Sequence, residues 1–485
     1  MTNTQAEQTL DPDDWDSFRS RAHAMLDAAI DQMINAPQGR VWHPVTDEIK
    51  AALQSDLPAL GDAQTTDAQM KNLLPYGVGN THPRFFGWVH GAGTPSNILA
   101  EMAAAAMNAN LGGRDHVAIY VEKQVIAWVK AIFDFPASAS GLIVSGTSIA
   151  TLIALKAARD RVSDFAARKT GISAGQLVGY TSTQTHSCVA RAFDMLGLGT
   201  DALRKIPVNA NFEIDTDALR AAIKADRAAG LTPFAVIGTA GAVNVGAIDD
   251  LDTLADIAAG ENIWLHIDGA FGATGILSDE IKPKLRGIER TDSIAFDFHK
   301  WLHVNYDAGF VLMRSEADHR RAFSERPDYL KGADRGLAAG NPWPTEYGPE
   351  LSRGFRALKI WAQLSEHGTE KLGQLISQNC AQARYLGQLV DADPQLERRA
   401  PVAMNICCFR YTAPETNLNT LNEEIVIQLQ LRGIAAPSTT MIHGETAIRV
   451  NITNHRTRRA DLDILTAAIR EIGAELVGSG SHAAH

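Results

Sequence analysis

The chain has 485 residues, of which 45% are hydrophobic and 21% charged, as in ordinary globular proteins. A single compact core stops growing at about 250–300 residues, so we expect one large domain with smaller parts attached. The net charge of −11, the absence of basic runs and the lack of a long apolar stretch argue against nucleic-acid and membrane partners, which leaves small-molecule chemistry as the expected function class.

The four cysteines, at positions 188, 380, 407 and 408, form no CxxC pair and no spacing typical of a zinc site or a disulfide framework. This pattern favours a reducing compartment. The N-terminal sequence MTNTQAEQTLDPDDWDSF lacks the basic start and apolar centre of a signal peptide. We therefore expect a cytoplasmic protein that holds no metal.

The N-terminal part of the chain is predicted to be helical. From Trp15 to about Leu60, apolar residues recur at spacings of three and four, and Pro44 interrupts the pattern. The apolar face carries Phe18, Ala22, Met25, Leu26 and Ile30. We expect residues 1–90 to form an N-terminal helical segment.

Between Leu142 and Arg314, short apolar runs alternate with amphipathic helical stretches. The runs are GLIVS, LVGYT, FAVIGT, NIWLHID, SIAFD and GFVLMR. Such alternation is typical of an α/β layer with a mostly parallel sheet, in which ligands gather at the carboxyl ends of the strands. We expect a large α/β domain at residues 91–345, with the functional residues just after its strands.

The segment KGADRGLAAGNPWP, residues 331–344, is rich in glycine and proline and has no periodicity, which predicts an exposed loop of the kind that often forms a lid. A helical period then returns in ELSRGFRALKIWAQLSEHG, and VAMNICCFRY and AIRVNIT are predicted strands. We expect a small C-terminal α/β domain at residues 346–485, with the tail GSGSHAAH frayed.

Two residues at predicted strand ends indicate aldehyde-cofactor chemistry. Lys300 follows SIAFD within DFHKW, where aromatic and imidazole neighbours can desolvate its amine and make it a nucleophile. Asp268 ends NIWLHID, where a buried carboxylate requires a cationic partner such as a protonated pyridine nitrogen. That pairing keeps a pyridoxal ring an electron sink. Taken singly, the lysine would be interpreted as a surface charge and the aspartate as a cap.

Three further segments can complete such a site. Thr147 and Ser148 follow GLIVS and Gly146 at a predicted helix start, where N–H groups and hydroxyls can bind a phosphate, although plain N-capping gives the same pattern. His186 follows LVGYT, and its imidazole can stack on a cofactor ring or serve as a hydrogen-bonded structural residue. Thr239 ends FAVIGT before a glycine-rich turn, within reach of a cofactor bound at these strand ends.

The motifs HPRFFG, SGTS, THSCVARA, GTAGAVNVGAIDD, WLHIDGAFGA and DFHKWLHVNYDAGFVL, in this order, resemble the group II pyridoxal-phosphate-dependent decarboxylases. These include aromatic amino-acid, histidine, glutamate and diaminobutyrate decarboxylases. The resemblance spans roughly residues 15–470. It implies a fold-type-I, aspartate-aminotransferase-like homodimer that binds pyridoxal 5'-phosphate, with the active site at the subunit interface and the N-terminal helices packed on the partner.

Carried over position by position, the resemblance assigns the cofactor contacts. Lys300 matches the Schiff-base lysine, Asp268 the partner of the pyridine nitrogen and His186 the ring-stacking histidine. The other matches are Thr147, Ser148 and His299 on the phosphate side, Asp297 close to the phosphate, Thr239 near the cofactor and Ala270 under the ring. The implied reaction converts an L-amino acid, with an aromatic one expected, to an amine and carbon dioxide through a Lys300 Schiff base and a quinonoid intermediate.

The proton donor to the α-carbon departs from the family pattern. Aromatic amino-acid decarboxylases carry a tyrosine in the mobile loop, but residues 331–344 contain none, and the matching position falls near Trp343 or Pro344. Tyr347 is therefore the candidate catalytic acid, while Tyr329 and Tyr347 can alternatively anchor the loop. Because loss of that tyrosine in relatives accompanies oxidative deamination, an aldehyde synthase stays open as an alternative.

Four residues are expected to shape the substrate pocket. Trp88 suits an aromatic side chain, whereas His90 introduces a polar group beside it. Asn108 and Asn110 fall where the resemblance places apolar pocket residues of the partner subunit, so decarboxylation of a polar or acidic amino acid is a second alternative. Arg449 is interpreted as structural, because a decarboxylase gains little from a cation that clamps the leaving carboxylate.

Other classes of protein share parts of this pattern. They are an aminotransferase or carbon–sulfur lyase on the same fold, a metal hydrolase, and a non-catalytic cofactor-binding protein. The histidines open to a metal hydrolase are His82, His90, His116, His299 and His303. No HExxH or similar ligand spacing supports a metal site, and the intact Lys300 and Asp268 disfavour a non-catalytic protein.

Overall fold

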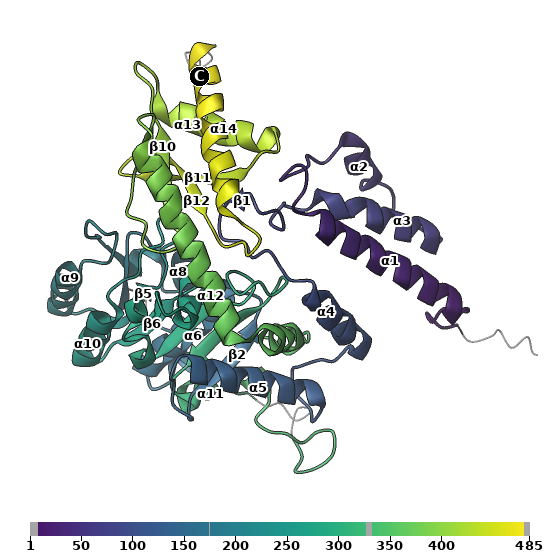
Figure 1. The fold of residues 1–485 in the computed structure, drawn as a ribbon. Helices are drawn as coiled ribbons and strands as arrows, with labels where there is room; N and C mark the ends of the chain where they lie inside the picture. Colours follow the sequence, from purple (N-terminus) through teal and green to yellow (C-terminus); the bar gives the residue numbers. More distant parts are fainter. Residues whose placement is uncertain (1–7, 174, 326–331, 480–485) are drawn as a thin grey trace, which may run out of the picture.

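The computed structural model describes residues 8–173, 175–325 and 332–479. Its first helices are α1 (Trp15–Asn35), α2 (Asp47–Ala52) and α3 (Ala63–Leu73). None of their residues is buried, and Figure 1 shows the three helices standing away from the body of the chain. The predicted N-terminal helices are thus confirmed, and the interruption predicted at Pro44 lies in the linker between α1 and α2.

A seven-stranded sheet forms the centre of the chain (Figure 1). In spatial order its strands are β2 (Ser140–Val144), β8 (Gly309–Met313), β7 (Ser293–Asp297), β6 (Trp264–Asp268), β5 (Thr232–Thr239), β3 (Leu177–Ser182) and β4 (Leu203–Ile206). Of these described strands, β8 alone runs antiparallel to its neighbours. The mostly parallel sheet is therefore confirmed. The short edge strand β4 escaped prediction because two of the four residues in its LRKI sequence are charged, which leaves no apolar run.

Helices cover both faces of this sheet. Successive strand residues point to opposite sides, and because the residues on both sides are apolar, each face must be covered. In β7, Ile294 and Phe296 pack in one apolar cluster, whereas Ala295 lies in the other. The helices between the N-terminal segment and the end of the large domain are α4 (Ser96–Met107), α5 (Val117–Ile132), α6 (Thr147–Val162), α7 (Ala167–Thr170), α8 (Ser187–Met195), α9 (Thr216–Ala228), α10 (Leu251–Glu261) and α11 (Glu316–Phe323). Residues of α6, α8 and α11 contribute to one cluster, and residues of α5, α9 and α10 to the other.

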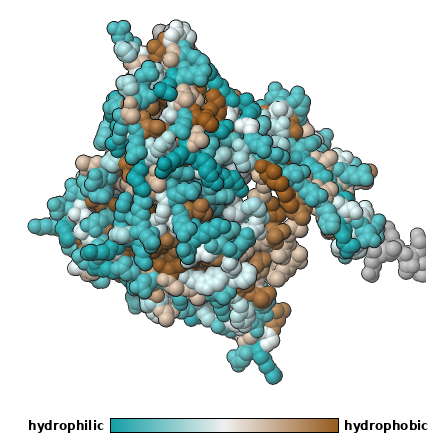
Figure 2. All heavy atoms as spheres, viewed as in Figure 1, coloured by the Kyte–Doolittle hydropathy of each residue, from teal (hydrophilic) through white to brown (hydrophobic). Residues whose placement is uncertain are grey.

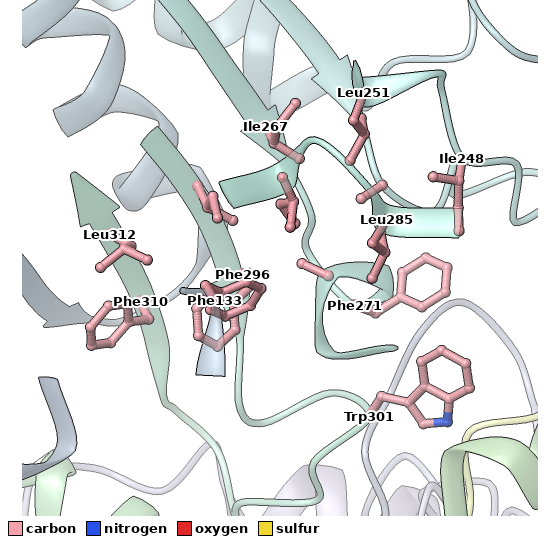
Figure 3. Packing of buried hydrophobic residues seen from close by; sticks show 14 of the residues in the cluster. Phe133, Ile248, Leu251, Ile267, Phe271, Leu285, Phe296, Trp301, Phe310 and Leu312 are labelled. Carbon is pink, nitrogen blue, oxygen red and sulfur yellow. The ribbon is translucent and has the colours of Figure 1, made fainter. Parts of the chain in front are cut away.

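The larger apolar cluster includes residues that precede and follow Lys300 in the sequence, among them Phe296 and Trp301 (Figure 3). Before the lysine, the Phe296 ring packs against those of Phe133 and Phe310, with centroids 5.3 and 5.4 Å away. After it, Trp301 is buried beside Phe271, and its indole N–H donates to Asn379 Oδ1 at 3.0 Å. Buried side chains on both sides therefore hold the turn that carries Lys300 in place.

A second, five-stranded sheet forms the smaller layer at the C-terminal end. Its spatial order is β1 (Phe85–Phe86), β11 (Ala436–Ile442), β12 (Glu445–Asn451), β10 (Ile406–Tyr411) and β9 (Leu396–Arg398). The segment α12 (Arg356–Ala392), two helices joined at a kink at Gly368, leads into it, and α13 (Leu418–Leu431) and α14 (Arg459–Gly478) pack on it. The small C-terminal α/β layer is as predicted, but it also recruits a strand from the N-terminal part of the chain.

Strand β1 pairs in parallel with β11, so Phe85 and Phe86, near the end of the expected N-terminal segment, belong to the C-terminal sheet. After β1 the chain passes the cavity of the large sheet at Trp88, Val89 and His90 before it enters α4. This path brings Trp88 and His90 to the carboxyl ends of the central strands. No helix within the described residues is long and apolar enough to cross a bilayer.

Candidate active site

A cavity of about 550 Å³ opens at the carboxyl ends of the central strands. It gathers most of the predicted site residues, which are Trp88, His90, Thr147, Ser148, His186, Thr239, Asp268, Ala270, Asp297, His299 and Lys300. A larger surface hollow of about 1170 Å³ beside α11 contains none of them. The chemistry therefore assigns the smaller cavity as the site, at the place where parallel sheets bind ligands.

Lys300 lies in the turn after β7 and faces Asp297, the last residue of that strand. The Lys300 Nζ is 2.8 Å from Asp297 Oδ2, and the Thr147 N–H donates to Asp297 Oδ1 at 2.7 Å. Asp297 is buried, whereas the lysine side chain keeps about a fifth of its surface exposed. The Asp297 carboxylate thus contacts both the Lys300 amine and the first turn of α6. The amine remains accessible from the cavity.

The start of α6 has the features of an anion site. The helix begins at Thr147 without a side-chain cap, and Gly146 before it lies beside Asp297 and His299. The buried Thr147 Oγ1 has no partner among the described residues, and Ser148 beside it is exposed. An unpartnered buried hydroxyl at the amino end of a 16-residue helix fits a phosphate group.

Asp268 ends β6 as a wholly buried carboxylate. Its Oδ1 accepts the Ala270 N–H at 3.2 Å, and its Oδ2 accepts the Cys188 thiol at 3.7 Å. Burial raises the pKa of Asp268, while Lys300 and His186 act to lower it. A carboxylate in this position gains from a cation delivered by a ligand, and a protonated pyridine nitrogen meets that need.

His186 and Thr239 complete the part of the cavity near Asp268. The His186 Nδ1 accepts the Cys188 N–H at 3.2 Å at the start of α8, which leaves Nε2 as the protonated nitrogen. The buried Thr239 Oγ1 has no hydrogen-bond partner within the described chain. Both side chains therefore offer a polar group to a bound molecule.

An aromatic wall closes the other side of the cavity. The His299 Nδ1 accepts the Ala308 N–H at 3.0 Å, and the Tyr306 ring packs on the imidazole with centroids 4.3 Å apart. Tyr306 also contacts His90 at 5.9 Å, and His90 contacts Trp88 at 5.9 Å. Burial lowers the pKa of His90, with Lys300 adding to the effect, and burial raises the pKa of Tyr306 to about 12. Both side chains are therefore neutral at pH 7.

Sequence reasoning missed Cys188 and Tyr306, which both line the cavity. Cys188 stands two residues after His186 in THSCVARA, so its place in the first turn of the helix was a readable signal. Tyr306 follows Lys300 by six residues in HKWLHVNYD, and no local pattern showed that the chain turns back to stack it on His299.

Three predicted residues lie elsewhere. The Tyr347 hydroxyl donates to Glu316 Oε1 at 2.5 Å, and the His319 Nε2–H donates to the Tyr347 carbonyl at 2.6 Å. Its ring is buried against α11, outside the cavity of this chain, and its hydroxyl already has a hydrogen-bond partner. The cavity of one chain therefore does not include the residue expected as catalytic acid. The reason is a packing contact with α11 that the loop sequence does not reveal.

Asn108 and Asn110 also lie outside the cavity formed by this chain. Asn108 ends α4 in the left-handed conformation, and Asn110 Oδ1 accepts the N–H groups of Gly112 and Arg353 at 2.9 and 3.0 Å. Asn110 therefore fixes the local backbone. Arg449 is wholly buried and donates to the carbonyls of Val243 and Trp88, in agreement with a structural role.

Gly91 supplies a test of how tightly the cavity is built. A Cβ at this position would lie 2.2 Å from the His299 carbonyl oxygen and 2.4 Å from that of Lys300. We expect Gly91→Ala to displace the lysine turn, to cost about 1–3 kcal/mol of stability and to slow reaction of Lys300 with an added aldehyde. The measurements are thermal unfolding and the rate of aldehyde capture at Lys300.

Gly77→Ala is the matched control for Gly91→Ala, because a Cβ at Gly77 meets no atom within 4 Å and its φ is −68°. Equal behaviour of the two variants would contradict the close packing described here.

The donor set fits pyridoxal 5'-phosphate better than a metal ion. A lysine amine, a buried carboxylate, an unoccupied threonine hydroxyl and a helix start match an aldehyde, a ring nitrogen and a phosphate. Within the described residues, no three His, Cys, Asp or Glu side chains come together as metal ligands.

Comparison with known proteins identifies the family. Residues 47–412 match the conserved domain of pyridoxal-dependent decarboxylases. The chain is 32% identical over 475 residues to an aromatic-L-amino-acid decarboxylase of Bacillus atrophaeus. The matched region covers 95% of this chain and 96% of that protein. It is 26% identical to a phenylacetaldehyde synthase of Petunia hybrida, with 95% and 94% covered. The solved tryptophan decarboxylase of Catharanthus roseus in complex with L-tryptophan gives a TM-score of 0.86 at 26% identity, with 96% and 100% covered.

The fold and this cavity define a fold-type-I pyridoxal-phosphate enzyme. The chain belongs to the pyridoxal-dependent decarboxylase family, and its activity is the pyridoxal-phosphate-dependent decarboxylation of an amino acid.

Proposed function

We propose that the protein converts an aromatic L-amino acid to the corresponding amine and carbon dioxide. The aromatic wall formed by Trp88, His90 and Tyr306 carries this proposal, because three neighbouring rings in tilted and edge-to-face contact line the cavity with aromatic surface against which an aromatic side chain can pack. Trp88 is more than half exposed and is therefore free to contact a substrate. The similar proteins named for aromatic amino acids support the same class.

The residues of the cavity divide the work of this reaction. Bound pyridoxal phosphate supplies the electron sink that accepts the electrons of the broken carbon–carbon bond. We assign Lys300 to bind its aldehyde carbon, Asp268 to hold the ring nitrogen protonated and Thr147 to contact its phosphate. His186 would pack on the cofactor ring and orient the substrate carboxylate. Asp297 keeps the lysine at the cavity through their 2.8 Å contact.

We propose that the active unit is a cytoplasmic homodimer with the active site at the subunit interface. Helices α1, α2 and α3 bury none of their residues within one chain. Helix α4 exposes Leu99, Met102 and Met107, and Figure 2 shows apolar side chains on this side of the molecule. Such surface suits a second copy of the chain, which would bring its Asn108–Asn110 segment towards the cavity. All four cysteines are free thiols, as expected in a reducing compartment.

The test is product analysis of the cofactor-loaded enzyme with aromatic, polar and acidic L-amino acids. Amine and carbon dioxide in equal amounts from an aromatic substrate are the expected result. Aldehyde with ammonia and peroxide would replace the proposed reaction by that of an aldehyde synthase, and amine from a polar or acidic substrate alone would overturn the proposed substrate class.

Replacing Tyr347 by phenylalanine tests whether its hydroxyl donates a proton in the reaction. We expect an unchanged ratio of amine to aldehyde, because the hydroxyl is held by Glu316 outside the cavity. Loss of this buried hydrogen bond should instead lower stability by about 1–3 kcal/mol. Product analysis and thermal unfolding measure the two effects. Tyr306→Phe is the comparison, since it removes a hydroxyl within the cavity, and a changed product ratio in Tyr347→Phe alone would restore Tyr347 as a catalytic acid.

A further inference from the structure

Cys188 is placed between two side chains that face the cofactor cavity. Its backbone N–H donates to His186 Nδ1 at 3.2 Å, and its thiol donates to Asp268 Oδ2 at 3.7 Å. The residue is 3% exposed and begins the buried side of α8. A single residue thus holds the predicted ring-stacking imidazole through its backbone and the predicted nitrogen-binding carboxylate through its side chain.

We propose that Cys188 is a positioning residue that fixes the orientation of the Asp268 carboxylate for the cofactor ring nitrogen. The inference rests on the role proposed above for Asp268. The described chain gives this carboxylate two donors, the Ala270 N–H on Oδ1 and the Cys188 thiol on Oδ2. Without the thiol, one bond would remain, and the carboxylate could rotate about its Cβ–Cγ bond.

The chemistry of the thiol suits this role. Burial raises the pKa of Cys188, and the charge of Asp268 adds to the effect, so the sulfur keeps its proton and acts as a donor. A neutral thiol adds no charge beside the carboxylate, which stays available to a cationic ring nitrogen. The S–H group is a weaker donor than a hydroxyl, so it orients the carboxylate without competing strongly for its negative charge.

The experiment compares cofactor binding by Cys188→Ala and Cys188→Ser with that of the natural enzyme. The readouts are the dissociation constant of pyridoxal phosphate, measured by spectroscopic titration of the cofactor-free protein, and kcat and KM in separate assays. We expect the alanine variant to bind the cofactor about 5- to 20-fold more weakly, with kcat reduced and KM little changed. The serine variant should stay within about 3-fold of the natural enzyme, because it restores a donor.

Two controls separate positioning from packing. Cys380 is an equally buried free thiol outside the cavity, so Cys380→Ala reproduces the loss of a buried sulfur without the bond to Asp268. Cys188→Val fills the space without a donor and serves if the alanine variant does not fold. The backbone N–H that holds His186 is unchanged in every variant.

The outcomes are distinct. Unchanged cofactor affinity in Cys188→Ala, equal loss in Cys188→Ser, or equal loss in Cys380→Ala would each overturn the positioning role. If Asp268→Asn also binds the cofactor as tightly as the natural enzyme does, the role proposed for Asp268 fails first. Weak binding by Asp268→Asn and Cys188→Ala, together with rescue by serine, would support the inference.

Discussion

Replacing Lys300 by alanine is expected to lower kcat by about 10³-fold or more and to abolish covalent capture of the cofactor. The physical reason is that Lys300 supplies the amine that faces the cavity, and its Nζ is held 2.8 Å from Asp297. Without it, the cofactor aldehyde has no internal partner and the substrate amine must react with the free aldehyde. Denaturation after borohydride reduction measures capture, and single-turnover amine release measures the rate.

Lys224→Ala is the control for Lys300→Ala, since this exposed lysine on α9 lies outside the cavity. Retention of covalent cofactor by the Lys300 variant would show that another amine reacts and would remove Lys300 from the proposed mechanism.

Asp268→Asn is expected to lower kcat by about 10²- to 10³-fold and to weaken cofactor binding. The amide is nearly the same size as the carboxylate but carries no negative charge, so it cannot hold the ring nitrogen in its protonated form. The Ala270 N–H and the Cys188 thiol both donate to this side chain, so an amide group would also turn one NH₂ towards a donor. Cofactor titration and steady-state kinetics measure the two effects.

Asp249→Asn is a matched control for Asp268→Asn. Asp249 is also buried next to β5, and its oxygens accept the N–H groups of Ile214 and Thr239 at 2.7 Å, but it does not line the cavity. We expect this variant to lose stability and, because Asp249 holds only the backbone of Thr239, to weaken cofactor binding less than Asp268→Asn does. If Asp268→Asn kept the kcat of the natural enzyme, Asp268 would not be the residue that holds the ring nitrogen protonated.

The strands of the large sheet were predictable because buried parallel strands have nearly continuous apolar sequences. SIAFD coincides with β7, and NIWLHID and FAVIGT each end where β6 and β5 end. The residues placed after those strands come together because the carboxyl ends of parallel strands share one edge. Strand β1 was not predictable, since two residues have no period and pair only with a strand about 350 positions later.

Side-chain partners at the site were less predictable than positions along the chain. Tyr347 looked available because it follows the loop, yet its hydroxyl is satisfied by Glu316 on α11. Tyr306 looked unremarkable, yet it stacks on His299 and extends the aromatic wall. The bond from Cys188 to Asp268 joins residues 80 positions apart and depends on how α8 packs beside β6.

The sequence by itself determined the class of fold through its apolar runs and helical stretches, and six motifs in order indicated the family through their resemblance to it. The lysine, the aspartate and the helix start were candidates for the site because each lies just after an apolar run or at its end. Only the tertiary structure decided which side chains meet across that cavity. Trp88 and His90 reach it because β1 joins the C-terminal sheet, and Tyr347 is kept from it by α11. The physical reason is that packing and hydrogen bonding between distant segments select the partners of a side chain, and these contacts leave no period in the sequence.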